Sequence, residues 1–235
     1  MRFSNIIFPS KCIFCGRITA DGKRACDECV KRLPYVTEPV CKHCGKPIAD
    51  SSQELCTDCR TWDHPGLDSS VALFVYLDET KKAMADLKYG GCFKDAGFYA
   101  DELCRHFYGR IRRWHADVLV PIPIHRRRMR YRGYNQAELV AAELGQRMGL
   151  PSQGLLRRTR YTSPQKDLNA QKRRENLRCA FEVDESVFRP DAHESIVLVD
   201  DIYTTGATLE ACAGLLKKAG ARAVYAVCIC IGSEA

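Results

Sequence analysis

The chain has 235 residues, enough for one or two domains, and 46% of them are hydrophobic, which is sufficient for a buried core. A charged content of 28% and the lack of any run of 18 apolar residues argue against insertion into a membrane. The formal net charge of +7 permits polyanionic partners without requiring nucleic acid.

Export and disulfide formation are not expected from this sequence. Residues 1–9 are too few, and too soon interrupted by proline, to form a secretory signal. The 14 cysteines include four CxxC pairs, a spacing typical of metal sites rather than of disulfide frameworks. We therefore expect a protein of the reducing cytoplasm.

Residues 1–65 hold all four CxxC pairs and show little hydrophobic periodicity, so we predict a small zinc-ribbon-like module folded around metal rather than around a core. Four thiolates complete a closed tetrahedral Zn²⁺ shell, which favours a structural role over a catalytic one. Pairing in chain order gives one site from Cys12, Cys15, Cys26 and Cys29, and another from Cys41, Cys44, Cys56 and Cys59. An interleaved pairing and a redox-active dithiol are the alternatives.

After a linker at 63–66, strand-like and helical patterns alternate. We predict, in order, a strand at 71–76, a helix capped by Thr80 and ending at Gly90, a helix through 103–114, a strand at 118–123, and a helix that starts at Asn135. A polar segment at 157–178, a strand at 196–199, a helix over 209–216 and a last strand at 224–231 follow. This alternation predicts an α/β domain over 66–235, with a parallel sheet flanked by helices.

The segment 196–209 (IVLVDDIYTTGATL) is the most informative part of the chain. A buried strand ends in Asp200 and Asp201 at the sheet edge where ligands bind in open α/β folds. The glycine in the following turn and the backbone N–H groups of the next helix suit phosphate. A phosphate site beside two diol-binding carboxylates fits a ribose 5-phosphate. An ordinary strand with an Asp cap and a threonine-rich turn is the alternative.

This segment resembles the phosphoribosyl pyrophosphate (PRPP) motif of type I phosphoribosyltransferases. The resemblance implies that Asp200 and Asp201 contact the ribose hydroxyls, directly or through Mg²⁺ and water. It also implies that the 5′-phosphate is wrapped by the turn, whose residues are Thr204, Thr205, Gly206, Ala207 and Thr208. Tyr203 is bulkier than the aliphatic residue that the resemblance leads us to expect. The prediction requires an open turn and an acid pair that is not folded inward and neutralised.

An arginine-rich run follows the strand at 118–123. We predict a loop here that holds pyrophosphate, because guanidinium groups match phosphate oxygens in pairs. A solvated basic loop or a nucleic-acid contact is the alternative. The arginines of the run are Arg126, Arg127, Arg128, Arg130 and Arg132.

The same run is similar to the signature of ComF-type proteins, a competence-associated phosphoribosyltransferase-like family. It reads His125, three arginines and then, at 132–136, Arg-Gly-Tyr-Asn-Gln. The family also has an N-terminal zinc-ribbon-like module, a Leu-Lys-Tyr element, here at 87–89, and an Arg-Arg-x-Asn-Leu segment, here at 173–177. The resemblance covers nearly the whole chain in the right order.

The resemblance implies which residues would form the site. Lys88 would be a phosphate or acceptor-side ligand, and Arg173 and Arg174 would meet the pyrophosphate from a hood at 161–176 that closes over PRPP and excludes water. Arg126, Arg127 and Arg132 would add phosphate contacts. A disordered basic loop is the alternative interpretation of the hood.

The expected activity is transfer of ribose 5-phosphate from PRPP to an unidentified acceptor, with release of pyrophosphate. Mg²⁺ and arginines would carry the charge of the leaving group. The second hypothesis is a module for transformation that senses PRPP without turnover or binds single-stranded DNA, together with competence-machinery proteins. A zinc redox protein is the third.

Overall fold

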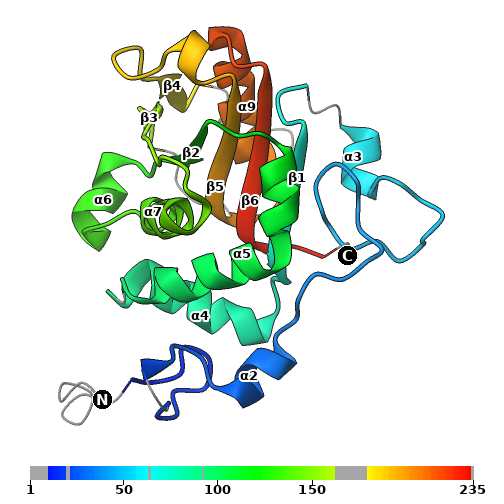
Figure 1. Cartoon of the computed structure of the whole chain (residues 1–235), viewed down its shortest axis with the longest axis vertical. Coiled ribbons are helices and arrows are strands. Elements are labelled where there is room, and N and C mark those ends of the chain that lie inside the picture. Colours follow the sequence, from blue (N-terminus) through cyan, green and yellow to red (C-terminus); the bar gives the residue numbers. More distant parts are fainter. Residues whose placement is uncertain (1–9, 20–21, 63–64, 92, 162–178, 234–235) are drawn as a thin grey trace.

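The computed structural model describes residues 10–19, 22–62, 65–91, 93–161 and 179–233. Two cysteine-containing ribbons precede an α/β domain (Figure 1). In chain order, the elements are α2 (Asp27–Arg32), α3 (Thr57–Thr61), β1 (Ser69–Val75), α4 (Asp78–Tyr89), α5 (Asp95–Arg113), β2 (Val118–Pro121), α6 (Arg126–Arg132), α7 (Gln136–Met148), β3 (Leu156–Arg158), β4 (Phe181–Val183), β5 (Ser195–Tyr203), α9 (Ala207–Ala219) and β6 (Ala223–Ile231).

The central sheet has the order β1-β6-β5-β2, and all its neighbouring strands are parallel. The predicted α/β class with a parallel sheet is therefore confirmed. Because the strands are parallel, their carboxyl ends meet at one edge of the sheet, where ligands bind in such folds. The strand predicted at 196–199 is longer and continues to Tyr203, so both aspartates lie within β5 rather than after it.

Helices cover both faces of the sheet because successive residues of each buried strand point to opposite sides. In β5, Val197 and Val199 belong to the core shared with α4, α5 and α7. Ile196 and Leu198 belong to the core on the opposite face, which α9 covers. Figure 1 shows α9 and the α4–α5–α7 group on opposite sides of the strands.

Both edges of the sheet are covered by extended chain, which removes exposed strand edges. Along β1, the N–H of Val36 donates to Leu73 O at 3.0 Å, and the N–H of Val75 donates to Pro34 O at 2.7 Å. Along β2, the N–H of Leu119 donates to Pro151 O at 2.9 Å. The chain between the two ribbons is thus part of the sheet.

The two ribbons attach to different faces of the α/β domain. Figure 1 shows the first ribbon near α4 and the second beside β1. The first ribbon packs Phe14 against Phe98 of α5, with ring centroids 5.7 Å apart. In the second ribbon, Cys41 and Cys44 are buried in the core that includes α9. The cysteines of the second ribbon therefore help to cover the sheet, while the first ribbon contributes Ile13 to the core on the opposite face.

Several predicted elements differ from the observed ones. The arginine run is not a loop but the short helix α6, which His125 caps by accepting the N–H of Arg127 at 3.2 Å. Helix α4 begins at Asp78, and Thr80 instead accepts the N–H of Leu77 from the third helical position. The predicted start of α7 at Asn135 is confirmed.

Two predicted segments fall partly or mainly outside the described residues. The linker at 63–66 includes residues 63 and 64, and the hood at 161–176 lies almost wholly within 162–178. The antiparallel strands β3 and β4 flank that second gap. Within the described ranges, no helix has the length and apolar character needed to cross a membrane.

Candidate functional site

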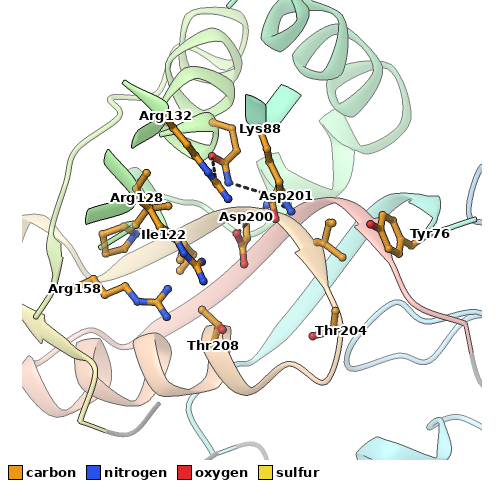
Figure 2. Close-up of a pocket in the computed structure, with 14 residues that line it drawn as sticks. Tyr76, Lys88, Ile122, Arg128, Arg132, Arg158, Asp200, Asp201, Thr204 and Thr208 are labelled. Carbon is orange, nitrogen blue, oxygen red and sulfur yellow. Dashed lines mark hydrogen bonds and ion pairs between the residues drawn. The ribbon is translucent and has the colours of Figure 1, made fainter. Parts of the chain in front are cut away.

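A cavity of about 310 Å³ opens at the carboxyl ends of β2 and β5, between the start of α9 and the end of α4 (Figure 2). It brings together three segments singled out in the sequence: the acid pair with its turn, the arginine run and the Leu-Lys-Tyr element. The lining residues are Tyr76, Lys88, Ile122, Pro123, Ile124, Arg128, Arg132, Gln136, Arg158, Asp200, Asp201, Ile202, Thr204 and Thr208.

The turn between β5 and α9 is shaped for an anion. Gly206 has φ +75° and forms the N-cap of α9, so the free N–H groups of a 13-residue helix begin here. Any side chain at position 206 would collide with the ring of Tyr203. Thr204 and Thr208 line the cavity, whereas Thr205, Gly206 and Ala207 are not among its lining residues. The turn is open to solvent at Thr204, as the prediction requires.

Asp200 points into the cavity (Figure 2). Burial, and then the neighbouring charge of Asp201, raise the pKa of its carboxyl to about 7. The backbone N–H of Asp201 donates to Asp200 Oδ1 at 2.9 Å and favours the ionised form, but does not outweigh these effects. The ionised form of this buried carboxylate is therefore stabilised by any ligand that provides a metal ion or hydroxyl donors.

Asp201 has a different environment, although it is adjacent in sequence. Its Oδ2 lies 3.1 Å from the Lys88 ammonium and accepts a hydrogen bond from the Gln136 amide at 2.5 Å. It is 7% exposed. Asp201 lines the cavity together with Asp200, but its charge is neutralised by Lys88, so the requirement stated for the acid pair is met in full by Asp200 only.

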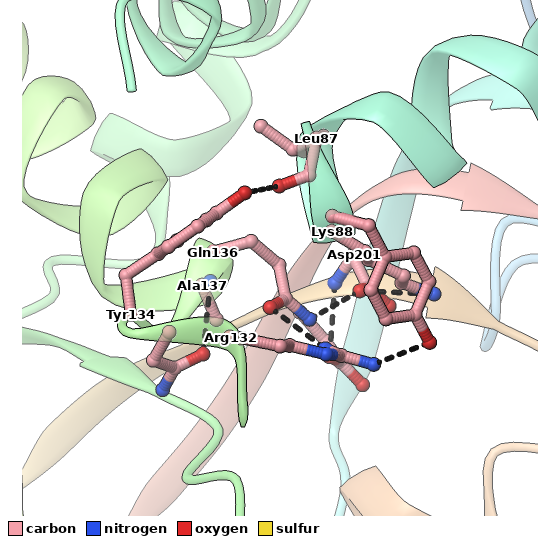
Figure 3. Close-up of polar contacts among 10 residues, drawn as sticks. Leu87, Lys88, Arg132, Tyr134, Gln136, Ala137 and Asp201 are labelled. Carbon is pink, nitrogen blue, oxygen red and sulfur yellow. Dashed lines mark hydrogen bonds and ion pairs between the residues drawn. The ribbon is translucent and has the colours of Figure 1, made fainter. Parts of the chain in front are cut away.

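The Leu-Lys-Tyr element and the 132–136 motif meet around this carboxylate (Figure 3). Tyr134 donates its hydroxyl to the carbonyl of Leu87 at 2.6 Å, which fixes the end of α4. Arg132 donates to the Gln136 side chain at 3.1 Å and to the Tyr89 hydroxyl at 3.0 Å. Gln136, to which the sequence assigned no role of its own, joins the two motifs to Asp201.

The arginines of the run do not all face the cavity, because α6 is a helix and its side chains point in several directions. Arg128 and Arg132 line the cavity. Arg126 and Arg127 are exposed and are not among the lining residues, and the guanidinium of Arg127 lies 5.3 Å from the ring centroid of Tyr161.

Arg158, on β3, is a lining residue that sequence reasoning missed. Burial, and then the nearby charge of Arg128, lower the pKa of its guanidinium. Two arginines that repel each other at one cavity wall form a site for a polyanion. No local pattern distinguishes Arg158 from other basic residues, since only the fold brings β3 to the cavity. Arg173 and Arg174 lie outside the described residues.

The cysteines group in chain order, which excludes an interleaved pairing. In each of the two predicted sets the four sulfur atoms lie within 4.8 Å of one another. The Sγ atoms of Cys15 and Cys26 are 3.8 Å apart, and those of Cys44 and Cys56 are 3.6 Å apart. A tetrahedron with Zn–S bonds of about 2.3 Å has edges of about 3.8 Å, so both clusters fit zinc.

Thiolate formation is favoured at one cysteine of each cluster, Cys12 and Cys41, whereas burial raises the pKa of Cys29. Burial raises the pKa of Cys12, but N–H groups of Cys15, Cys26 and Phe14 outweigh it and lower this pKa to about 6. A thiolate stabilised by backbone donors is the form that binds a metal ion. A closed set of four sulfur ligands leaves no position for a reacting water, which supports structural zinc.

Comparison with known proteins identifies two different domain families in this chain. The profile of the double zinc ribbon domain matches residues 3–60, and that of the phosphoribosyl transferase domain matches residues 129–234. Competence protein F of Haemophilus influenzae is 30% identical over 91% of this chain and 93% of its own length. Competence protein ComFC of Bacillus subtilis is 29% identical over 84% of this chain and 80% of its own length.

A more limited match is the DNA utilization protein YhgH of Escherichia coli, which is 36% identical over 48% of this chain and 49% of its own length. The fold and the matched domains define a phosphoribosyltransferase-like domain preceded by a double zinc ribbon. Its similarity to the competence proteins extends over most of both chains, and the chain belongs to the ComF family.

Proposed function

We propose that this protein binds PRPP with Mg²⁺ and transfers its ribose 5-phosphate to an acceptor, with release of pyrophosphate, in the cytoplasm. One observation carries the proposal. Two threonines of the turn at the start of α9, a carboxylate with a raised pKa and a pair of arginines line the same cavity. These are the three kinds of group that a phosphate, a ribose diol and a pyrophosphate require.

The proposed roles follow from position in the cavity. The 5′-phosphate would lie on the turn, held by backbone N–H groups and by Thr204 and Thr208. Asp200 would accept hydrogen bonds from the ribose hydroxyls. Arg128 and Arg158, on the opposite wall, would bind the pyrophosphate, with Arg173 and Arg174 as further candidates. Lys88, already paired with Asp201, would keep that carboxylate neutralised and add positive charge to the site.

In the reaction, the bond between the anomeric carbon and the pyrophosphate oxygen breaks, and the electron pair leaves with pyrophosphate. A bond forms from the acceptor to the same carbon, and the acceptor loses its proton to solvent or to the leaving group. Arginines fixed in the cavity stabilise the charge of the leaving group without reorganising. Magnesium, when bound with PRPP, would neutralise part of that charge, and the carboxylate oxygens of Asp200 suit it as a ligand.

Calorimetric titration with PRPP and Mg²⁺ tests binding, and pyrophosphate release with candidate acceptors tests turnover. The Asp200→Asn, Asp201→Asn double variant should lose PRPP binding at least about tenfold, since it removes the charge of the diol acceptor and the ionic partner of Lys88. Arg158→Ala should weaken pyrophosphate binding by a similar factor, whereas Arg130→Ala, whose residue is exposed on α6, should change it less than about twofold. Unaltered PRPP affinity in the double variant would exclude this site.

A second candidate function is binding of single-stranded DNA, and the exposed side of α6 supports it. Tyr131 is 83% exposed between Arg130 and Arg132, and Tyr89, 60% exposed, packs edge-on against it with ring centroids 6.5 Å apart. Arginines interleaved with exposed aromatic rings form stacking surfaces for single strands. The names of the relatives, which refer to competence and DNA utilization, agree with this surface.

The salt dependence of binding distinguishes the two candidate functions. Binding of an oligodeoxythymidine should weaken steeply with added salt, and each phosphate contact removed should lower the slope of log K against log salt by about 0.7. Arg126→Ala combined with Arg130→Ala should lower this slope and leave PRPP binding unchanged. A slope near zero in the unsubstituted protein would contradict the second candidate function.

A further inference from the structure

We propose that the second cysteine cluster, acting through Tyr203, holds the turn at residues 204–208 in its anion-binding shape, and that the first cluster does not. The two clusters would then have different roles despite their similar sequences. The inference rests on the proposed function only in identifying the ligand of the turn as PRPP. The shape of the turn itself can be measured without any ligand.

The second cluster is attached directly to the first residues of β1. Ser70, in β1, donates its hydroxyl to Cys44 O at 2.9 Å and its N–H to His43 O at 2.8 Å. Any side chain at Gly45 would meet the backbone of β1. The metal-binding loop of the second ribbon therefore packs directly on β1. The conformation of this loop depends on the cysteine sulfurs that bind the metal.

The start of α9 is tied to the same region. Glu210, in the first turn of α9, accepts the N–H of Gly66 at 2.7 Å and the N–H of Leu67 at 3.1 Å. Burial raises the pKa of Glu210, while these N–H groups and His43 lower it, which indicates that the second ribbon lies close to this carboxyl. The helix whose N-terminus forms the turn is thus fixed to the segment that follows the ribbon.

Tyr203 connects the cluster to the turn. Its ring fills the space at Gly206 that a side chain would occupy, so it packs directly under the turn. It is 4% exposed and belongs to the same buried core as Cys41, Cys44 and Cys56. The aromatic ring found where an aliphatic residue was expected thus has a packing role.

The first cluster has other contacts. Within the described ranges, its ribbon packs on α5, with Phe14 against Phe98, and on Phe74 of β1. Arg24 pairs with Asp95, the first residue of α5, through its Nε at 2.7 Å. Ile13 belongs to the core on the sheet face opposite to Tyr203. Loss of metal there should loosen α5 and leave the turn unchanged.

The chain provides a matched pair of variants for the test. Cys29→Ser and Cys59→Ser each remove the last ligand of one cluster, and both cysteines are partly exposed in the first turns of short helices. Each variant should lose one of two zinc ions. In ligand-free protein, Cys59→Ser should raise amide exchange at Glu210, whose N–H donates to Gly206 O at 2.9 Å and closes the turn, at least about tenfold, and Cys29→Ser should change it less than about twofold. Equal effects of the two variants, or no effect of Cys59→Ser, would overturn the inference.

Variants of Tyr203 test the connection without touching the cluster. Tyr203→Leu should retain both zinc ions and still accelerate exchange in the turn, whereas Tyr203→Phe, which keeps the ring, should restore protection to within about twofold of the unsubstituted protein. If Tyr203→Leu leaves the turn protected, Tyr203 is not the connection. Exchange in α7 serves as the control for general unfolding.

The outcome is separable from that of the proposed function. If PRPP does not bind to the unsubstituted protein, the proposed function fails, and the exchange measurements still support or overturn the inference. If PRPP binds, Cys59→Ser and Tyr203→Leu should raise its dissociation constant in proportion to the loss of the ordered fraction of the turn, because only the ordered turn binds.

Discussion

At the scale of single residues, two adjacent aspartates of identical chemistry have separate tasks. Asp201 is neutralised by Lys88 and Gln136, whereas Asp200 faces the cavity with a pKa raised to about 7. The difference arises because successive side chains of a strand point to opposite faces, so only one of the two meets the end of α4. Neighbouring carboxylates are commonly separated in this way at functional sites.

The raised pKa of Asp200 predicts a pH-dependent cost to stability. An aspartate in the unfolded chain titrates near 4, so between about pH 4 and pH 7 the folded protein holds a proton that the unfolded chain releases. Stability therefore falls as the pH rises through this window. Asp200→Asn should increase the free energy of unfolding, and by about 1–2 kcal/mol more at pH 8 than at pH 5.5, as measured by urea denaturation.

Asp184 provides a control of opposite sign. The hydrogen bond from Ser186 lowers its pKa, burial opposes this effect, and Arg157 lowers the pKa further. The ionised carboxylate of Asp184 stabilises the folded protein above about pH 4. This stabilisation is lost only as the pH falls through the lowered pKa that Asp184 has in the folded state. Asp184→Asn should therefore destabilise the protein equally at pH 5.5 and pH 8. A similar pH profile for both variants would refute the explanation of the Asp200 effect.

At the scale of elements, the start of α7 shows how one side chain can join two parts of the site. Asn135 is 1% exposed; its Oδ1 accepts the N–H of Ala137 at 3.1 Å, and its amide donates to Ile122 O at 3.0 Å. It therefore fixes the first turn of the helix that carries Gln136 against the cavity wall that follows β2. The Asn-x-x-Glu pattern predicted the cap but not this second contact.

Substitution of Asn135 should destabilise the protein through both contacts. Asn135→Ala should lower the free energy of unfolding by about 2–4 kcal/mol, because it leaves a helix N–H and a buried carbonyl unpaired. Asn135→Asp retains the capping acceptor and loses only the donor, so its loss should be smaller. Denaturant titration measures both values, and a neutral Asn135→Ala would show that the cap contributes nothing.

At the scale of the whole molecule, the two ribbons are attached by different kinds of contact. The second shares the α9-side core with the sheet, whereas the first is attached to α5 by aromatic packing and by the ion pair of Arg24 with Asp95, which is 3% exposed. Buried ion pairs are costly to break, since the remaining charge keeps its desolvation penalty.

Attachment of the first ribbon should therefore depend on Asp95. Asp95→Ala should accelerate limited proteolysis within residues 10–33 at least about tenfold, which corresponds to a loss of about 1.4 kcal/mol or more. Asp101→Ala, on the same helix, breaks an exposed ion pair with Arg147, and it should change the rate less than about threefold. PRPP binding should be unaltered in both variants, and equal proteolysis rates would argue against this ion pair as the anchor.

The sequence by itself determined the α/β class, the alternation of the main strands and helices and the location of the β5–turn–α9 motif, but not α6, β3 or β4. These features depend on side-chain periodicity and on the backbone freedom of single residues such as Gly206, which are local properties. The CxxC spacing likewise indicated metal ligation, because the ligands of one knuckle lie within a few residues of each other.

Only the tertiary structure decided which groups face each other across the cavity. Arg128 and Arg158 line the cavity, whereas Arg126 does not. This difference depends on the direction in which each side chain leaves helix α6 and on the position of β3 next to the cavity, which no local pattern encodes. Pairing of Lys88 with Asp201, and burial of Cys44 in the same core as Tyr203, join residues more than a hundred positions apart. Such contacts are selected by packing of the whole chain, since their energies arise only once distant elements have come together.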